Sequence, residues 1–179
     1  MKLLLHICCA PCLIYPLEKL RKDGFEVSGF FYNPNIHPFS EYKARREALE
    51  EVGKKYAVEV SYPPYSPSEY FRAVNLKEES PQRCGICWFL RLKAAAKQAK
   101  EKGLDCFSTT LLVSPYQNQE LLKKIGDDIA AEEGIRFYYE DFRPGFRKAH
   151  DEAKAKRVYC QKYCGCIYSE LERYTKSKK

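Results

Sequence analysis

Short apolar runs alternate with longer amphipathic stretches along this chain, and this order restricts the fold more than any other property of the sequence. The runs rich in β-forming residues cover residues 2–7, 25–32, 58–62, 106–113 and 135–139. The stretches with helical spacing cover residues 13–23, 40–56, 69–74, 83–102 and 119–132. Strands that alternate with helices require crossover connections, so this order predicts a parallel sheet with helices on both faces. The length suits one core, and we predict a single three-layer α/β domain over residues 1–179.

Three turns follow predicted strands and should meet at one edge of this sheet. They are Cys8–Cys12 (CCAPC), the Asn33–Asn35 turn (NPN) and the Ser114–Gln117 turn (SPYQ). Ligands of open parallel sheets bind beyond the carboxyl ends of the strands. The first turn also precedes a helix, whose N-terminus favours anionic thiolates. The sequence therefore predicts a site at this edge. Ser40 is the predicted N-cap of the helix that follows the second turn.

The N-terminus imitates a signal peptide, because Lys2 precedes three leucines. His6 and the cysteines close this apolar region early, whereas a secretory segment needs roughly 7–15 apolar residues. No stretch approaches the ~20 apolar residues of a membrane span. We therefore predict a cytoplasmic protein with no membrane partner. In a reducing compartment, an odd number of cysteines, nine in all with most in tight clusters, indicates metal binding rather than disulfides.

Seven cysteines form three tight groups, and their number limits the kind of metal site. The groups are Cys8, Cys9 and Cys12; Cys84 and Cys87; and Cys164 and Cys166. A C-x-x-C pair alone fits a zinc half-site, a redox pair or half of an iron–sulfur site. A structural zinc site is saturated by four ligands, and adjacent Cys8 and Cys9 are expected to point in different directions. A [4Fe–4S] cluster takes about four cysteines from dispersed positions, so the surplus favours iron–sulfur over zinc.

The remaining cysteines and the histidines carry weaker signals. Cys106 opens an apolar run and is predicted to lie in the core, whereas Cys160 has no assigned role. His6 is predicted to be a core residue or a support for the ligands. His37 lies in the turn at the predicted site edge, and His150 lies in a basic stretch that should be surface. The net charge of +7 favours a polyanionic partner.

Five motifs in order resemble the QueH family, the cobalamin-independent epoxyqueuosine reductases. They are HICCAPC, FYNPNIHPxxEYxxR, RCGICxxxRL, FSTTLLVSPYQ and YCGC, and together they span nearly the whole chain. The resemblance implies a Rossmann-like fold similar to the adenine-nucleotide α-hydrolases (HUP-like), with cysteines in place of the nucleotide-binding loop. It also implies that epoxyqueuosine, at the wobble position of tRNA, loses its epoxide oxygen to give queuosine.

The family resemblance implies a [4Fe–4S] cluster beside a second, mononuclear iron. The implied ligand candidates, shared between the cluster and the second iron, are Cys8, Cys9, Cys84, Cys87, Cys164 and Cys166. Some relatives have an aspartate where this chain has Cys12, and a thiolate there would change the Lewis acidity of the metal. We predict Cys12 as a further metal ligand, with Cys9 and Cys12 as the catalytic residues. The reaction consumes two electrons and two protons, so an external electron donor is implied.

The implied substrate is an anticodon loop, in which the modified base can stack on aromatic side chains. The predicted substrate residues are Asn33, Asn35, His37, Tyr42, Arg45, Tyr116 and Gln117. Further candidates are Tyr32 and Phe146 for stacking, and Arg83, Arg143, Arg147 and Lys148 for phosphates. Core or surface roles remain alternatives for each of them.

Two other functions fit parts of this pattern. An iron–sulfur tRNA thiolase of the ATP-pyrophosphatase type suits the fold and the cysteines, but needs a loop similar to SGGxDS where this chain has CCAPC. A non-catalytic zinc or iron–sulfur module that binds RNA suits the charge and the cysteines.

Overall fold

The computed structural model of this chain describes residues 1–175, and a sheet of five parallel strands lies at its centre. The strands are β1 (Lys2–His6), β2 (Glu26–Phe30), β3 (Val60–Ser61), β4 (Cys106–Thr109) and β5 (Arg136–Phe137). Their order is β3-β2-β1-β4-β5, with Leu3 of β1 in register with Val27 and with Cys106. Because β1 is covered on both faces, its side chains do not alternate in burial: Leu3, Leu4 and Leu5 are all buried.

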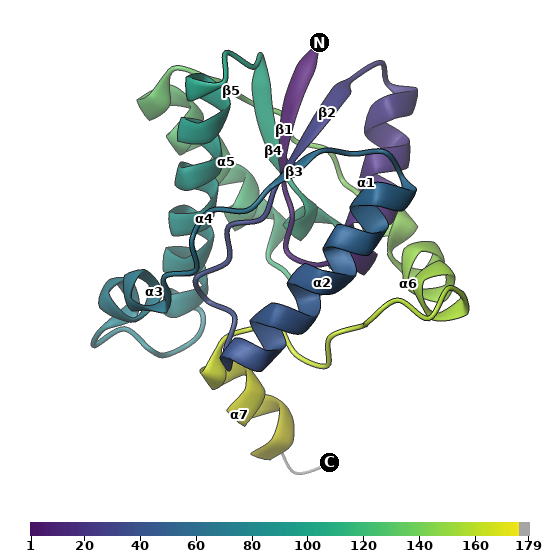
Figure 1. Cartoon of the computed structure of the whole chain (residues 1–179). Helices are drawn as coiled ribbons and strands as arrows, with labels where there is room; N and C mark the ends of the chain where they lie inside the picture. The colour runs from purple at the N-terminus through teal and green to yellow at the C-terminus, as the bar shows by residue number, and fades with distance from the viewer. Residues whose placement is uncertain (176–179) are drawn as a thin grey trace.

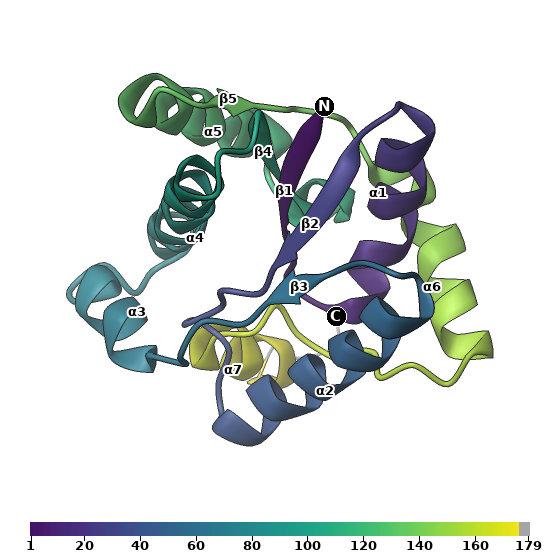
Figure 2. The ribbon, with the colours of Figure 1, turned by 45° about the horizontal axis from the view of Figure 1, so that its top comes forward.

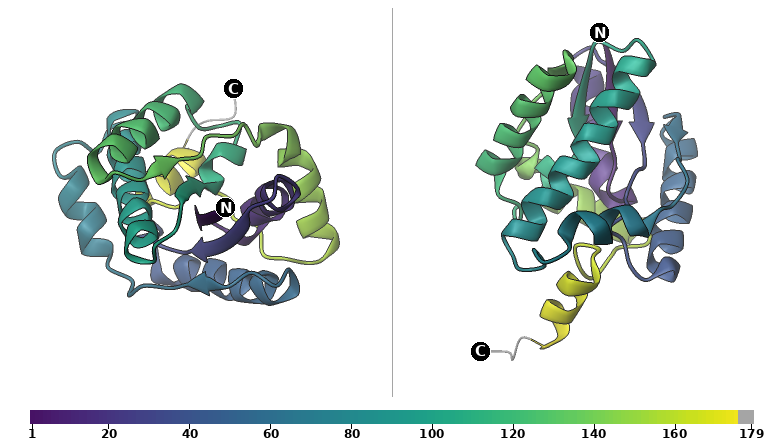
Figure 3. Two further views of the ribbon diagram at one scale, coloured as in Figure 1. Left: turned by 90° about the horizontal axis from the view of Figure 1, so that it is seen from above. Right: turned by 90° about the vertical axis from the view of Figure 1, so that its left-hand side faces the viewer.

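Helices cover both faces of the sheet (Figure 1, Figure 2). One face carries α1 (Ala10–Lys22), α2 (Phe39–Lys55) and α6 (Phe146–Ala155), and the other carries α4 (Gln82–Glu101) and α5 (Gln119–Glu133). α1 packs on β2, α2 and α6, whereas α4 packs on β1, β4 and α5. Right-handed crossovers explain this division, since the chain moves from β1 toward β3 and then returns across the sheet to β4 and β5. Seen from above, the sheet lies between the two helical layers (Figure 3).

The strand order reverses between β1 and β4, at the sheet's centre. α3 (Pro67–Val74) and α7 (Ile167–Thr175) lie beyond the carboxyl ends of the strands, on the side of the molecule opposite the N-terminus (Figure 1). Segments 67–81 and 160–175 are thereby brought to the edge at which parallel sheets bind ligands. Among residues 1–175, no helix is both long and apolar enough to cross a membrane.

The predicted order of strands and helices is confirmed, and the differences lie at the ends of elements. The fourth predicted strand is too long: β4 ends at Thr109, and Thr110–Val113 forms a 3-10 turn. The Thr109 hydroxyl causes this turn, because it accepts a hydrogen bond of 3.1 Å from the Leu111 backbone N–H. The third and fifth strands are also shorter than predicted, with two residues each.

The predicted N-cap at Ser40 is wrong, because α2 begins at Phe39 and Ser40 lies inside its first turn. Pro38 precedes the helix with an extended backbone and makes no side-chain cap. The basic region near the C-terminus forms α6 and α7, as its composition suggests. Pro144 and Gly145 lie in a 3-10 turn, Arg143–Gly145, directly before α6.

Candidate metal centre

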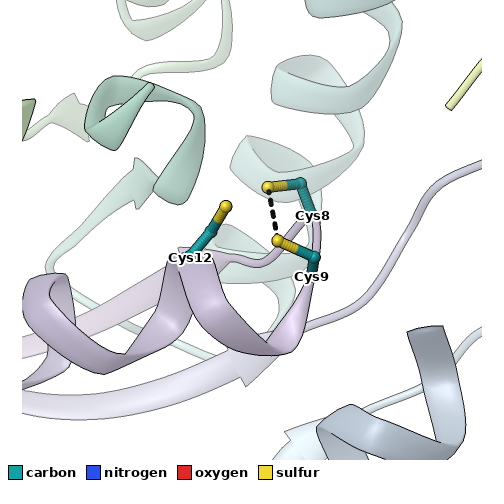
Figure 4. Close-up of side chains that lie close together, drawn as sticks. All are labelled: Cys8, Cys9 and Cys12. Atoms are coloured by element: carbon teal, nitrogen blue, oxygen red, sulfur yellow. Dashed lines mark hydrogen bonds between the residues drawn. The ribbon is translucent and has the colours of Figure 1, made fainter. Parts of the chain in front are cut away.

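The turn after β1 brings three thiols together at the start of α1 (Figure 4). Cys9 is the N-cap residue of α1, and Cys12 follows three positions later, so both lie on the same side of the first helical turn. Pro11 suits this turn because its missing N–H would have no helical partner there. The sulfur atoms of Cys8, Cys9 and Cys12 all lie within 4.8 Å of one another.

The expectation that Cys8 and Cys9 point in different directions is wrong. Their Sγ atoms are 3.8 Å apart, and Figure 4 shows both side chains directed toward the same space. The extended backbone of Cys9 at the helix cap turns its side chain back toward Cys8. The three thiols can therefore bind a single metal ion.

The thiol of Cys8 ionises at a lower pH than the thiols of Cys9 and Cys12. Hydrogen bonds donated by Cys12 and Cys9 hold the pKa of the Cys8 thiol well below its usual range. Burial raises the pKa of the Cys9 thiol. The hydrogen bond between Cys12 and Cys8 raises the pKa of the Cys12 thiol. Thr110 adds a further bond of 3.3 Å from its hydroxyl to Cys8 Sγ. The group thus carries one thiolate readily, and metal binding would release the protons of the other two.

The second set of thiols comes from two segments distant in sequence. Cys84 and Cys87 lie in the first turns of α4, and Cys164 and Cys166 lie in the loop before α7. Cys87 and Cys166 are buried in one small apolar cluster with Tyr70. Burial, with a contribution from Cys164, raises the pKa of Cys87 to about 12. Burial likewise raises the pKa of Cys84, whereas Cys164 is exposed to solvent.

The loop that carries Cys164 and Cys166 is fixed by Arg45. The Arg45 guanidinium is buried, donates to the carbonyl oxygens of Cys164 (2.9 Å) and Tyr163 (3.1 Å), and pairs with Glu41 at 2.7 Å. Gly165, between the two cysteines, has φ of +148°, and a Cβ there would lie 3.0 Å from Asn35 Nδ2. Only glycine meets both conditions without strain.

Arg91 of α4 joins the cysteine turn to the second set. Its Nη1 lies 3.8 Å from Cys87 Sγ, and its Nη2 donates to Asn33 Oδ1 at 2.7 Å. Its Nε lies 3.4 Å from Nε2 of His6, the last residue of β1. Asn33 in turn donates from Nδ2 to the carbonyl oxygen of Ile7 at 2.9 Å. All seven clustered cysteines thus come from segments at the same edge of the sheet.

Two of the predicted substrate residues, Asn35 and His37, are buried beside the loop that carries Cys164 and Cys166. Asn35 is buried, and its Oδ1 has no hydrogen-bond partner in the part of the chain that the structure describes. His37 is buried against Phe71, with ring centroids 4.5 Å apart, and its two ring nitrogens also lack partners among the described residues. Asn35 and His37 both border the Gly165 loop, since the His37 backbone N–H donates to the Gly165 carbonyl oxygen at 2.8 Å.

Gln117 reaches the second set of thiols, whereas the two predicted tyrosines do not. Gln117 Nε2 lies 3.8 Å from Cys164 Sγ. Tyr42 is buried and stacks on Tyr65 with centroids 4.1 Å apart, which gives it a core position. Tyr116 is 83% exposed and touches Phe146 edge-on.

Three of the four basic side chains predicted to contact phosphates form ion pairs with carboxylates. Arg83 is buried and pairs with Glu172, Arg143 pairs with Asp141, and Lys148 pairs with Glu18. The Tyr32 hydroxyl donates to Glu69. Arg147 is exposed.

The predictions for the two isolated cysteines and for two of the histidines are confirmed only in part. Cys106 is buried in the main core, as predicted, and His6 is a buried support residue whose Nδ1 lies 2.9 Å from Thr109 Oγ1. Cys160 packs beside the small cluster of Ile14, Ala149 and Ala153. The surface position predicted for His150 is wrong, because its ring is partly buried against Phe146 at 4.5 Å and burial lowers its pKa.

Several side chains that contact the clustered thiols were not predicted from the sequence. Gln161 donates from Nε2 to Cys9 Sγ at 3.0 Å, Thr110 and Arg91 contact Cys8 and Cys87, and Ser80 Oγ lies 3.8 Å from Cys84 Sγ. Gln161 lies three residues before Cys164, so its place beside a cysteine motif was the only signal. Only the fold reveals that it reaches Cys9, which is 152 positions away in sequence.

Comparisons with known proteins match nearly the entire chain to a single family. The family described as "Epoxyqueuosine reductase QueH" matches residues 3–172. A protein of that name from Dehalococcoides mccartyi is 39% identical over 176 residues, which cover 98% of this chain and 96% of the relative. One from Thermotoga maritima is 38% identical over 181 residues, with 97% and 92% covered.

A solved structure supports the fold alone. It is described as a predicted subunit of tRNA methyltransferase from Methanocaldococcus jannaschii, with a TM-score of 0.57 and 10% identity. The match covers 86% of this chain and 76% of that one.

Proposed function

Because this chain belongs to the epoxyqueuosine reductase QueH family, we propose that it reduces epoxyqueuosine in tRNA to queuosine. Both carbon–oxygen bonds of the epoxide break, a carbon–carbon double bond forms, and the oxygen leaves as water after uptake of two electrons and two protons. The observation that carries this proposal is the family match over residues 3–172, which includes all seven clustered cysteines.

We further propose that the seven thiols hold a [4Fe–4S] cluster and a second, mononuclear iron. The residues present suit an iron–sulfur cluster and an iron ion, because free thiols are soft ligands. The Sγ atoms of Cys8, Cys9 and Cys12 also lie within 4.8 Å of one another. A cluster takes about four cysteines, which leaves three for a second metal with an open position. When bound, the group would supply electrons and a Lewis acid for carbon–oxygen cleavage.

The chain's own side chains would stabilise the anionic ligands and hold them in place. Thr110 and Gln161 donate hydrogen bonds to the sulfurs of Cys8 and Cys9, and such bonds tune a metal–thiolate site. Arg45 fixes the loop of Cys164.

The proposed substrate is the anticodon loop of a tRNA, and the electrons come from an external donor. The net charge of +7 favours a polyanion at the surface. Free thiols in this number require a reducing compartment, so we propose the cytoplasm as the place of action.

The test is conversion of the substrate by reconstituted protein. The protein would be reconstituted anaerobically with iron and sulfide and incubated with a strong reductant and epoxyqueuosine-containing tRNA. Digestion of the tRNA and mass spectrometry should then show a nucleoside lighter by one oxygen. Cys87→Ala should abolish conversion, while the matched core variant Cys106→Ala should retain it. Unconverted tRNA with a fully reconstituted protein would reject the reductase function.

A further inference from the structure

Among residues 1–175, three arginines have buried side chains, and one of these makes no ion pair with a carboxylate. Arg45, Arg83 and Arg91 are 1%, 3% and 1% exposed. Arg45 pairs with Glu41 at 2.7 Å, and Arg83 pairs with Glu172 at 2.6 Å. Within residues 1–175, Arg91 makes no ion pair with a carboxylate. A buried cation without a counter-charge is strongly unfavourable, so a partner of another kind must compensate Arg91.

The polar groups around Arg91 are neutral or are thiols. Nη2 donates to the side-chain amide oxygen of Asn33 at 2.7 Å, and Nε faces His6 Nε2 at 3.4 Å. His6 Nε2 also lies 3.2 Å from the Tyr32 carbonyl oxygen, and an imidazole carries no negative charge. The remaining contact is with Cys87 Sγ at 3.8 Å. The amide and imidazole orient the guanidinium but add no negative charge.

Of these three contacts, only the Cys87 sulfur can carry a negative charge, as the thiolate of a bound centre. Arg91 is also linked to the cysteine turn, because its partner Asn33 donates to the carbonyl oxygen of Ile7, the residue before Cys8, at 2.9 Å. One buried cation is thus connected both to the thiols of α4 and to the turn after β1.

We propose that Arg91 is the counter-cation of the iron–sulfur centre and sets its reduction potential. This inference rests on the proposed function. Each electron from the external reductant adds one negative charge to a thiolate-bound centre, and a buried cation favours the more negative state. Arg91 is thus a positioning and electrostatic residue, which makes the centre easier to reduce.

Four variants of the full chain test this role without using tRNA. Arg91→Gln removes the charge, and Asn33→Asp neutralises it by placing a carboxylate beside Nη2. Arg91→Lys retains the charge, and Lys97→Gln removes an exposed charge from the same helix as a matched control. Each protein is reconstituted anaerobically with iron and sulfide, and its midpoint potential is measured by a mediated titration followed by absorbance and electron paramagnetic resonance.

At a fixed potential, Arg91→Gln and Asn33→Asp should lower the ratio of reduced to oxidised centre at least tenfold, or about 59 mV for a one-electron couple. Arg91→Lys should restore most of this difference, and Lys97→Gln should match the original protein. Equal potentials in all five proteins would overturn the inference.

The same preparations give a second measurement if a variant binds the centre poorly. Circular dichroism of the metal-free proteins identifies those that fold. Loss of iron from folded Arg91→Gln and Asn33→Asp, with retention in Arg91→Lys, supports the counter-cation role. Equal loss from folded Arg91→Lys overturns it. An original protein that takes up no iron and sulfide would instead reject the proposed function.

Discussion

At the scale of single residues, Arg45 shows how burial changes the role that a motif suggests. The sequence makes Arg45 a candidate for substrate binding. In the fold its guanidinium is 1% exposed and donates to the carbonyl oxygens of Tyr163 and Cys164. Its charge is matched by Glu41 on the same helix. The residue therefore supports the loop that carries Cys164 from within the protein.

Arg45→Met should strongly destabilise the metal-free protein. It leaves the Glu41 carboxylate, 10% exposed, without its cation, and breaking a buried pair in this way costs about 3–5 kcal/mol. The neighbouring Arg46→Met is the matched control, because Arg46 pairs with Glu50 at the surface and should cost below about 1 kcal/mol. Urea unfolding measures both free energies. Similar losses from the two variants would contradict the assigned role of Arg45.

His6 should make the stability of the metal-free protein depend on pH. The unfolded chain binds a proton near pH 6.5, whereas burial and Arg91 lower the pKa in the folded protein to about 3. Stability contributed by neutral His6 is therefore lost as pH falls below 6.5, at up to about 1.4 kcal/mol per pH unit.

Urea unfolding at pH 7 and pH 5 should show a His6 contribution of about 2 kcal/mol. His6→Gln has no titrating group at this position and should reduce the pH dependence by that amount. His37 and His150, whose pKa values are lowered by burial, act in the same direction in both proteins. An unchanged pH dependence in His6→Gln would contradict the burial of a neutral imidazole.

At the scale of elements, the order of strands and helices could be predicted from periodicity, and the ends could not. The runs of β-forming residues identify five strands, but Thr109 ends β4 early by a local hydrogen bond to Leu111 that no apolar pattern reveals. Likewise, the cysteine motifs identify the ligand candidates, whereas the approach of Gln161 to Cys9 depends on the path of the chain between α6 and α7. Long-range contacts of this kind have no local signal in one sequence.

The packing of α5 on β5 depends on a glycine. A Cβ at Gly126 would lie 2.3 Å from the ring of Phe137, so Gly126→Ala must displace the ring and should cost about 1–3 kcal/mol. Gly85→Ala in α4 is the matched control, since its Cβ would meet nothing closer than Leu121 at 3.9 Å. That variant should be neutral or slightly stabilising in the metal-free protein, because alanine favours helix. Thermal unfolding would compare them, and a neutral Gly126→Ala would contradict this packing.

At the scale of the whole molecule, the positive charge should govern association with tRNA. Each phosphate contact releases counterions, so affinity falls with salt. We expect binding of epoxyqueuosine-containing tRNA to weaken about tenfold or more between 50 and 200 mM KCl. Fluorescence anisotropy with labelled tRNA measures this change, and the seven-charge excess on the protein is its source. Affinity independent of salt would contradict an electrostatic interface.

The central claim is that iron held by the clustered cysteines reduces the epoxide, and replacing the metal tests it most directly. One preparation would be reconstituted with iron and sulfide, one loaded with zinc and one left metal-free, all with the same reductant and epoxyqueuosine-containing tRNA. We expect queuosine only from the iron–sulfide preparation, because zinc has no accessible redox change. Equal formation of queuosine by the zinc-loaded or metal-free protein would contradict it.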